Sequence, residues 1–318
     1  MAEILTLALP FFGLILLGFG AGRFTRVDGN LEWFNHFIVY FALPALFFRL
    51  ISQTPFEQLV NWQFILTTTF ATYCAFALAF AVGVVVSRGE FGEAAIQGGL
   101  GAYANVGYLG PGLMLAALGP AATVPTALIF CFDSTLIFTL VPLLMAISGR
   151  DNRGIAAALV GVVRRVVTHP FIIATALGIA AAYFKLQPPA AIDKLLAMLS
   201  GAAAPCALFA MGVRIGIRPL TRVPSEMPFL IAIKLMVHPV IVLVLLISVG
   251  GFSEVWVHTA LLMAALPPAA NMFVLAQQYG VYVERASSTI MAGTAISVVT
   301  VTGLLFLISN DLIPLGPG

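Results

Sequence analysis

The chain has 318 residues, of which 61% are hydrophobic and only 9% are charged, and its formal net charge is +2. A soluble domain carries about 25% charged residues, so a chain this poor in charge cannot cover a globule that faces water. The small net charge also excludes the basic surface that nucleic-acid binding requires. Composition therefore predicts a polytopic membrane protein whose apolar surface is solvated by lipid.

Long apolar segments follow one another along the whole sequence. A helix of about 20 apolar residues crosses a bilayer, and on that measure the sequence predicts an all-α protein with ten transmembrane helices and short loops. The predicted spans cover residues 4–22, 33–52, 62–86, 94–117, 121–148, 162–184, 191–213, 228–250, 256–279 and 285–309.

The basic residues are distributed unevenly between the loops. Loops after odd-numbered spans carry eleven of the 15 Lys and Arg residues, whereas loops after even-numbered spans carry Arg49, Lys185 and Lys194. Because Lys and Arg accumulate in cytoplasmic loops, we expect the odd-numbered loops to be cytoplasmic and both termini to face outward. The eleven residues are Arg23, Arg26, Arg88, Arg150, Arg153, Arg164, Arg165, Arg214, Arg218, Arg222 and Arg285.

The two halves of the chain share short matches that occur in the same order. Each half holds five predicted spans, and an odd number of spans places the second half upside down in the membrane, as in many secondary transporters. The sequence therefore predicts two inverted five-helix repeats, residues 1–148 and 149–318. Chance similarity between apolar segments is the alternative explanation. The matches are PFFGLILLG (10–18) with PFIIATALG (170–178), LPALF (43–47) with APCALF (204–209), and Asn105 with Asn271.

Spans four and nine contain residues that interrupt helices. Span four is rich in glycine and carries Asn105 and Pro111, and span nine carries the pair Pro267-Pro268 followed by Asn271. Proline lacks the amide hydrogen that a helix interior requires, so we expect discontinuous helices whose free backbone groups face a cavity near the membrane midplane. The amino-terminal ends of such half-helices attract anions such as carboxylates. Plain kinks, with glycines that permit close helix packing, are the alternative.

Asp133 and Lys234 are ionisable residues that lie well inside predicted spans. A carboxylate at the depth of Asp133 in span five is costly, so we expect it to face the protein interior or water. It would there bind a proton or Na⁺, or pair with a cation. Lys234 in span eight is either a counter-charge for an anion or a side chain that extends to the membrane interface. A direct pair between Asp133 and Lys234 is a further alternative.

Two His-Pro pairs occur at the edges or inside apolar segments, His169-Pro170 and His238-Pro239. A histidine in a membrane span can take part in a proton relay. Proline, however, favours the first turn of a helix and kinks a helix interior. We therefore interpret both pairs as helix starts or kinks and keep the relay as the alternative.

Small and hydroxyl-bearing residues form two further patterns. Gly18 and Gly22 in span one form a small-xxx-small face, which predicts a helix-packing site. Thr294, Ser297 and Thr300 recur every three residues on one face of span ten. Such hydroxyls usually bond to their own backbone or to a neighbouring helix, and contact with a substrate is the alternative.

The motifs of enzymes, pumps and water channels are missing from the sequence. It contains no phosphate-binding loop for ATP, no HExxH pair and no Asn-Pro-Ala element, and only one aspartate lies deep in a span. Cys74, Cys131 and Cys206 stand singly in apolar stretches, where we interpret them as packing residues. We therefore predict no catalytic residue, no metal site and no cofactor, and a secondary transporter rather than an enzyme.

At the two broken spans the sequence resembles the auxin efflux carrier family. Residues 105–111, NVGYLGP, are similar to the fourth-span element of that family, and residues 267–300, which begin PPAANMFVLAQQYG, are similar to its ninth and tenth spans. Chain length, ten spans and outward termini also fit, so the resemblance covers nearly the whole chain. Because the long central loop of the plant exporters is missing here, the chain is most similar to the bacterial organic-acid permeases of the family.

The resemblance implies two inverted repeats in which spans four and nine cross at their proline breaks. Spans one, two, six and seven would form a scaffold that dimerises, and spans three to five and eight to ten would form a moving transport unit. In span four the plant exporters carry Asn-Pro-Asn, whereas here the proline comes six residues after the asparagine. The resemblance assigns to the crossing Asn105, Pro111, Pro267, Pro268 and Asn271. We expect these five residues, together with Tyr108, to bind the substrate.

These features together predict a transporter in the bacterial inner membrane that moves small carboxylates such as malate or malonate by alternating access. Asp133 is the candidate for H⁺ or Na⁺ coupling, Lys234 is a candidate counter-charge, and a uniport driven by the membrane potential stays open. Two alternatives also remain. One is a Na⁺-coupled symporter of bulkier organic anions on a related fold, and the other is a non-transporting membrane receptor.

Overall fold

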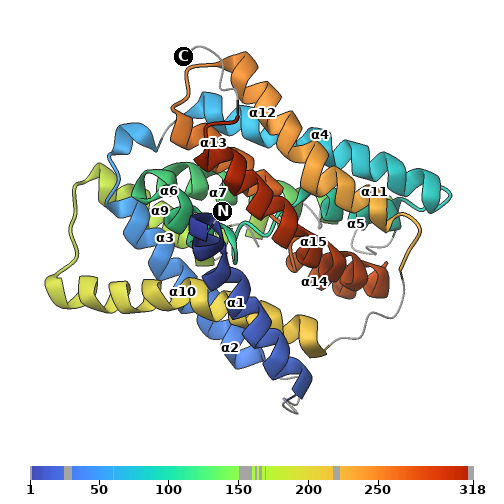
Figure 1. Ribbon diagram of the computed structural model, residues 1–318, viewed down its shortest axis with the longest axis horizontal. Helices are drawn as coiled ribbons and strands as arrows, with labels where there is room; N and C mark the ends of the chain where they lie inside the picture. The colour runs from blue at the N-terminus through green and yellow to red at the C-terminus, as the bar shows by residue number, and fades with distance from the viewer. Residues whose placement is uncertain are drawn as a thin grey trace. The chain divides into compact units, whose positions relative to one another are not determined.

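The computed structural model describes a helical protein (Figure 1). Within the residues that it describes, every regular element is a helix, and the one strand-like contact is an isolated bridge. The predicted all-α class is therefore confirmed. The described residues are 2–24, 31–59, 61–149, 160–161, 163–164, 167–168, 170–217 and 223–313.

Part of the basic residues that predicted the orientation fall outside the described residues, and so does one of the two His-Pro pairs. The orientation of the two termini therefore stays a prediction. The residues concerned are Arg26, Arg150, Arg153, Arg165, Arg218, Arg222 and His169.

Six helical segments in the described part of the chain are long and apolar enough to cross a membrane. Shorter apolar helices cover Gly13–Phe24, Ile172–Tyr183 and Glu254–Ala265. Large apolar side chains such as Leu17 and Val299 stand 67% and 74% exposed, which suits helices surrounded by lipid rather than water. The structure thus supports a membrane protein with several spans, and the count of ten stays a prediction. The six segments are Glu32–Ser52, Trp62–Val86, Pro120–Ile147, Ala190–Val213, Met227–Val249 and Val283–Ser309.

The chain divides into two compact units, which we describe separately. The first unit contains Met1–Trp62, Gly107–Cys131 and Thr168–Pro219. Its described helices are α1 (Ala2–Phe24), α2 (Glu32–Phe37), η1 (Ile38–Ala42), α3 (Leu43–Ser52), η2 (Phe56–Gln58), α6 (Gly110–Leu118), η3 (Pro120–Ala122), the beginning of α7 (Thr123–Ile147), α9 (Pro170–Tyr183) and α10 (Ala190–Ile217).

Close packing of α1 against α10 organises the first unit. Gly18 and Gly22 of α1 face α10, where a side-chain carbon on Gly18 would overlap the backbone carbonyl of Phe209. On α10, a side-chain carbon on Gly212 would overlap the carbonyl of Ile15 in the same way. Two helix backbones approach this closely only where the residues at the contact are small. The prediction that the Gly18–Gly22 face is a helix-packing site is confirmed.

The second unit contains Gln63–Val106, Phe132–Val167 and Leu220–Gly318. It therefore holds most of the polar residues that the sequence placed inside the membrane. Its described helices are α4 (Trp62–Val86), α5 (Phe91–Ala102), the remainder of α7, α11 (Met227–Ala232), η4 (Ile233–Val237), α12 (His238–Val249), α13 (Glu254–Ala265), α14 (Asn271–Tyr279) and α15 (Val283–Ser309).

The helix α5 is buried within the second unit. Its glycines make this possible, because Gly98 lies against the ring of Phe76 in α4 and Gly99 lies against the side chain of Met272 in α14. A Cβ at either glycine would be closer than ordinary van der Waals contact to those side chains. The glycines of span four thus serve close packing, which was the alternative explanation for them.

Two segments contain a π-helical turn that the sequence did not predict. In η4, the His238 N–H donates to the carbonyl of Ile233, five residues earlier. Pro239 follows in the first turn of α12, and Pro44 follows η1 in the same way at the start of α3. Proline cannot donate to the carbonyl four residues before it, so the helix widens by one residue there instead of breaking.

The helix contact in the first unit predicts a specific stability defect. We expect Gly212→Ala to destabilise the protein by about 1–3 kcal/mol, because the added carbon forces two backbones apart. Gly20→Ala on α1 is the matched control, since no atom lies within 4 Å of a Cβ built there. Thermal unfolding of the detergent-solubilised protein measures both, and equal melting temperatures would contradict the packing described above.

Candidate functional site

Two prolines end α13 and leave its last carbonyls without their usual donors. In a continuous helix, residues 267 and 268 would donate to the carbonyls of Met263 and Ala264, but both are prolines and have no amide hydrogen. The structure supplies other donors. The Leu266 N–H reaches the Met263 carbonyl at 3.3 Å, and the Lys234 ammonium group donates to the Ala264 carbonyl. The break in span nine is therefore compensated from a different helix.

The unwound segment between α13 and α14 pairs with an unwound segment that follows α5. Ala104 and Pro268 form an antiparallel bridge. The Asn105 N–H donates to the Pro267 carbonyl at 2.8 Å, and the Ala269 N–H donates to the Tyr103 carbonyl at 3.0 Å. Backbone groups in a hydrocarbon environment need internal partners, and these two segments satisfy each other. We call the paired segments 103–105 and 266–270 the crossing.

The crossing brings together some of the residues that the resemblance assigned to it. Asn105 is 2% exposed within it, and Pro267 and Pro268 supply its other strand. Asn271 is the first residue of α14 and is partly buried. Tyr108 and Pro111 belong to the first unit, with Pro111 buried in the first turn of α6.

A chain of polar side chains connects Asp133 of α7 with Lys234 of η4. The Thr72 hydroxyl of α4 donates to Asp133 Oδ1 at 3.1 Å and lies 3.3 Å from His238 Nε2. His238 Nδ1 lies 3.3 Å from Lys234 Nζ. All four residues are buried, with Lys234 at 0% and Asp133 at 3% exposure. We call Asp133, Thr72, His238 and Lys234 the polar chain.

The donors of the polar chain can all run in one direction. A lysine ammonium only donates, so His238 must accept at Nδ1 and therefore carries its hydrogen on Nε2. That hydrogen is donated to the Thr72 hydroxyl, which in turn donates to Asp133. The polar chain gives the buried His238 ring a partner on each side. The Thr72 hydroxyl also lies 3.2 Å from the Thr68 carbonyl, and Lys234 also donates to the Ala264 carbonyl.

The polar chain bears on alternatives that the sequence left open for Lys234, for an Asp133–Lys234 pair and for His238. Lys234 is 0% exposed, so it does not extend to the membrane interface. No direct ion pair joins it to Asp133 among the ion pairs of the described residues. His238 and Pro239 lie inside the continuous helical segment Met227–Val249, so this pair marks a distortion of the helix and not its start, and the His238 ring bonds on both sides. The sequence reasoning missed Thr72, a residue without any local signal for this role.

A second polar contact ties α7 to the crossing. The Tyr103 hydroxyl and the Ser134 hydroxyl lie 2.9 Å apart, and both side chains are buried. Asp133 and Ser134 are consecutive in α7, so one turn of that helix serves both the polar chain and the crossing. Sequence reasoning singled out neither Ser134 nor Tyr103 for this contact.

The hydroxyl residues of α15 bond within their own helix. Thr294 donates to the carbonyl of Ile290, and Ser297 donates to the carbonyl of Thr294, both at 2.7 Å. The backbone-bonding interpretation of this face is therefore confirmed for these two residues. Gln97 in α5 was missed by the sequence reasoning: it is 0% exposed and neither atom of its amide has a partner in the described part of the chain.

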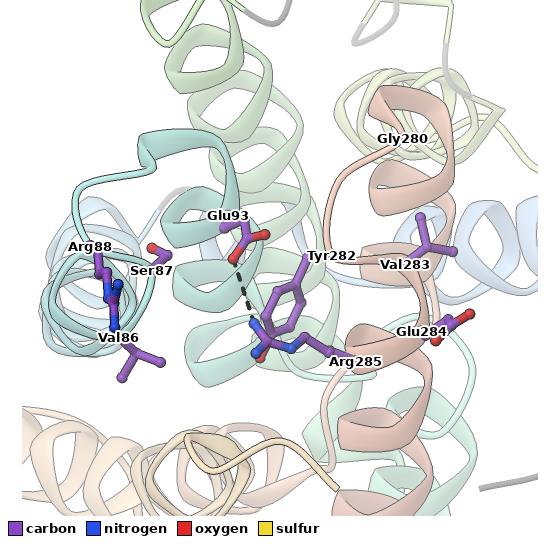
Figure 2. Close-up of a pocket in the computed structure, with 9 residues that line it drawn as sticks. All are labelled: Val86, Ser87, Arg88, Glu93, Gly280, Tyr282, Val283, Glu284 and Arg285. Atoms are coloured by element: carbon purple, nitrogen blue, oxygen red, sulfur yellow. Dashed lines mark ion pairs between the residues drawn. The ribbon is translucent and has the colours of Figure 1, made fainter. Parts of the chain in front are cut away.

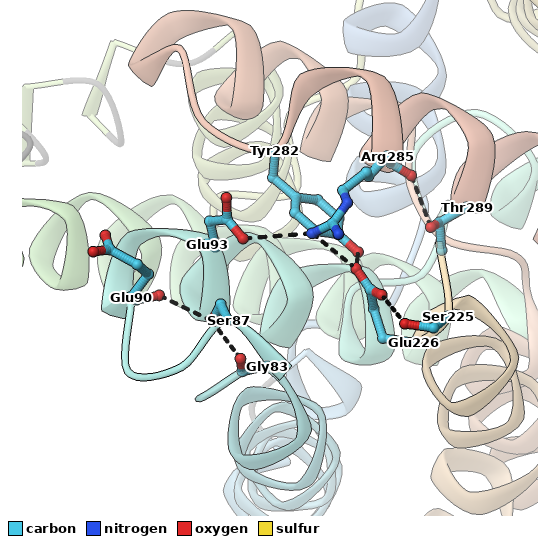
Figure 3. Close-up of polar contacts among 9 residues, drawn as sticks. All are labelled: Gly83, Ser87, Glu90, Glu93, Ser225, Glu226, Tyr282, Arg285 and Thr289. Carbon is cyan, nitrogen blue, oxygen red and sulfur yellow. Dashed lines mark hydrogen bonds and ion pairs between the residues drawn. The ribbon is translucent and has the colours of Figure 1, made fainter. Parts of the chain in front are cut away.

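A separate charged cluster joins the beginnings of α5, α11 and α15 (Figure 3). Glu226, 0% exposed, accepts hydrogen bonds from Ser225 and Tyr282 and pairs with Arg285 at 3.2 Å. Arg285 also pairs with Glu93 at 3.5 Å. Burial, and after it the hydrogen bond to Glu226, raises the pKa of Tyr282 well above its usual range, so the phenol stays a neutral donor.

The same cluster forms one wall of a pocket of about 580 Å³ (Figure 2). Arg285 and Glu93 face each other at its centre, and Glu284 points away from them. Because Arg285 pairs with both Glu93 and Glu226, we interpret the cluster as a structural contact between α5, α11 and α15.

The cluster predicts an order of destabilisation. Tyr282→Phe removes one hydrogen bond and leaves Glu226 paired with Arg285, so we expect a loss of about 1 kcal/mol. Glu226→Ala removes the acceptor of three groups, and we expect a loss of about 3 kcal/mol, as for a broken buried pair. The exposed Glu284→Gln is the control. Thermal unfolding in detergent tests this order, which equal effects of the first two changes would contradict.

Comparison with known proteins agrees with this helical, membrane-suited chain. Residues 3–305 match the family described as "Membrane transport protein". A Rhizobium meliloti (strain 1021) protein named "Putative malonate transporter" is 50% identical over 99% of this chain and 98% of its own length.

More distant relatives carry transporter names as well. "Uncharacterized transporter YfdV" of Escherichia coli (strain K12) is 24% identical over 92% of this chain and 93% of its own length. "Auxin efflux carrier component 1" of Arabidopsis thaliana is 29% identical over 36% of this chain and 18% of its own length. The chain belongs to the membrane transport protein family, which includes the auxin efflux carriers, and is a membrane transporter rather than an enzyme.

Proposed function

We propose that this protein is a secondary transporter that carries small carboxylates of the malonate and malate class across the bacterial inner membrane by alternating access. One finding supports the substrate class: a relative named for malonate transport is 50% identical over nearly the full length of both chains.

The crossing is the observation that carries the proposal. It places two interrupted helices side by side through paired backbone segments, Ala104 with Pro268 and its neighbours. Asn271 begins α14, and the N–H groups of Met272 and Phe273 already donate to the carbonyls of Ala269 and Ala270. The partial positive charge of this helix end would attract a carboxylate. The side-chain amides of Asn105 and Asn271 would add donors there.

The architecture that we propose for transport has ten spans in two inverted repeats, residues 1–148 and 149–318. Spans one, two, six and seven would form the scaffold of a homodimer, with both termini outward. The division of the chain supports this, because α4, α5 and α11–α15 group in the second unit, whereas α1–α3, α9 and α10 group in the first. The second unit would then be the larger part of what moves, and α6 groups with the first unit.

Uptake into proteoliposomes tests the proposal. We expect the purified protein to accumulate radiolabelled malonate or malate, and we expect Asn271→Ala to lower kcat/KM at least tenfold, because a hydrogen bond to a charged group contributes about 1.5–3 kcal/mol. Asn310→Ala, an exposed asparagine after α15 that bonds only locally, is the matched control.

Two outcomes would count against the proposal. Wild-type-like uptake by Asn271→Ala would remove the crossing as the binding site. Saturable binding of malonate without flux into a sealed vesicle, under imposed proton, Na⁺ and potassium gradients alike, would identify a receptor instead of a transporter.

A further inference from the structure

Lys234 is a buried cation at an unusual place. It lies inside the predicted span 228–250, it is 0% exposed, and it belongs to the π-helical turn η4. Single π-helical turns occur frequently at functional sites. Its ammonium group donates to the carbonyl of Ala264, thirty residues away in the chain. That carbonyl is one residue from the carboxyl end of α13, where Pro268 has removed the usual donor.

The carboxyl end of an interrupted membrane helix is the kind of place that attracts a cation. Its last carbonyls carry a partial negative charge, and in secondary transporters such ends and the unwound carbonyls next to them coordinate a coupling Na⁺. Here the ammonium group of Lys234 already occupies the Ala264 oxygen, and its second contact is a nitrogen, Nδ1 of His238. A metal cation at the same oxygen would have to displace it.

No cluster of three or more His, Cys, Asp or Glu side chains in the described residues could hold a metal ion. Asp133 is the acidic member of the polar chain, and its contact oxygen already accepts from Thr72. The charge of Lys234 is therefore matched within the protein, through His238 and Thr72, by a carboxylate on another helix.

We propose that the ammonium group of Lys234 is the resident cation of the crossing, that it takes the place of a coupling Na⁺, and that transport consequently needs no Na⁺. The inference rests on the proposed function for its transport readout, whereas the cation site itself rests on the contacts of Lys234 alone. Lys234 acts as a positioning residue: it holds the carboxyl end of α13 against η4 and so fixes the segment that leads into Pro267 and Asn271.

The first experiment compares Na⁺ with choline for the wild-type protein. We expect malonate uptake into proteoliposomes to differ less than twofold between the two cations. We also expect Na⁺ not to raise the melting temperature above that in choline at equal ionic strength, since a bound ion would stabilise the folded state. Uptake that falls tenfold or more in choline, or selective stabilisation by Na⁺, would overturn the proposal.

The second experiment removes the resident cation and replaces it from solution. We expect Lys234→Ala to lose at least tenfold in malonate uptake and to regain several-fold with ethylammonium or with Na⁺, which fit the vacated position. Tetramethylammonium is the control, because it carries the same charge but has no N–H to donate. A folded Lys234→Ala variant, judged by monodisperse gel filtration, that keeps wild-type uptake or that neither ion restores would overturn the proposal.

The two failures can be told apart. If the wild-type protein takes up neither malonate nor malate under any gradient, the proposed function fails, while the Na⁺ stabilisation measurement still decides the cation site. That measurement uses the unaltered protein, so it also decides the matter if Lys234→Ala does not fold. Lys185→Ala, an exposed lysine outside the polar chain, controls for the loss of a lysine as such.

Discussion

The structure depends on one constraint, that backbone groups inside a hydrocarbon environment must find partners within the protein. Pro267 and Pro268 have no N–H groups, so two carbonyls at the end of α13 lose their usual donors. The replacements come from elsewhere in the chain: Lys234 donates to the Ala264 carbonyl, and the segment around Asn105 pairs with the unwound residues. The interruption at the end of α13 is therefore compensated by groups from two other segments, η4 and residues 103–105.

The need for hydrogen-bond partners explains why the polar residues of the second unit lie close together. Lys234 is held at α13, and its charge needs compensation that Asp133 supplies through His238 and Thr72. The next residue in α7, Ser134, bonds to Tyr103 of the crossing. Donors and acceptors from α4, α7, α12 and η4 thus stabilise one another, and a buried polar atom that loses its last partner costs about 1–3 kcal/mol.

The first unit is stabilised by a different physical interaction. Its helices α1 and α10 approach through Gly18 and Gly22 on one side and Gly212 on the other. The contact depends on shape and on dispersion between closely packed backbones rather than on polar compensation. The first unit thus contains a close contact between two long helices, and the second unit contains the paired unwound segments. We propose that the substrate binds beside these unwound segments.

The sequence by itself determined the features that are local. Composition gave the membrane class, Pro267-Pro268 gave the break in span nine, and Gly18 with Gly22 gave a packing face, because each follows from properties of adjacent or helically spaced residues. Only the tertiary structure decided the partners. Lys234 and Ala264 are separated by 30 residues, Thr72 and His238 by 166, and Tyr282 and Glu226 by 56. A polar residue in an apolar segment predicts that it will have a hydrogen-bond partner. Which residue becomes that partner depends on how helices that are distant in the sequence pack together.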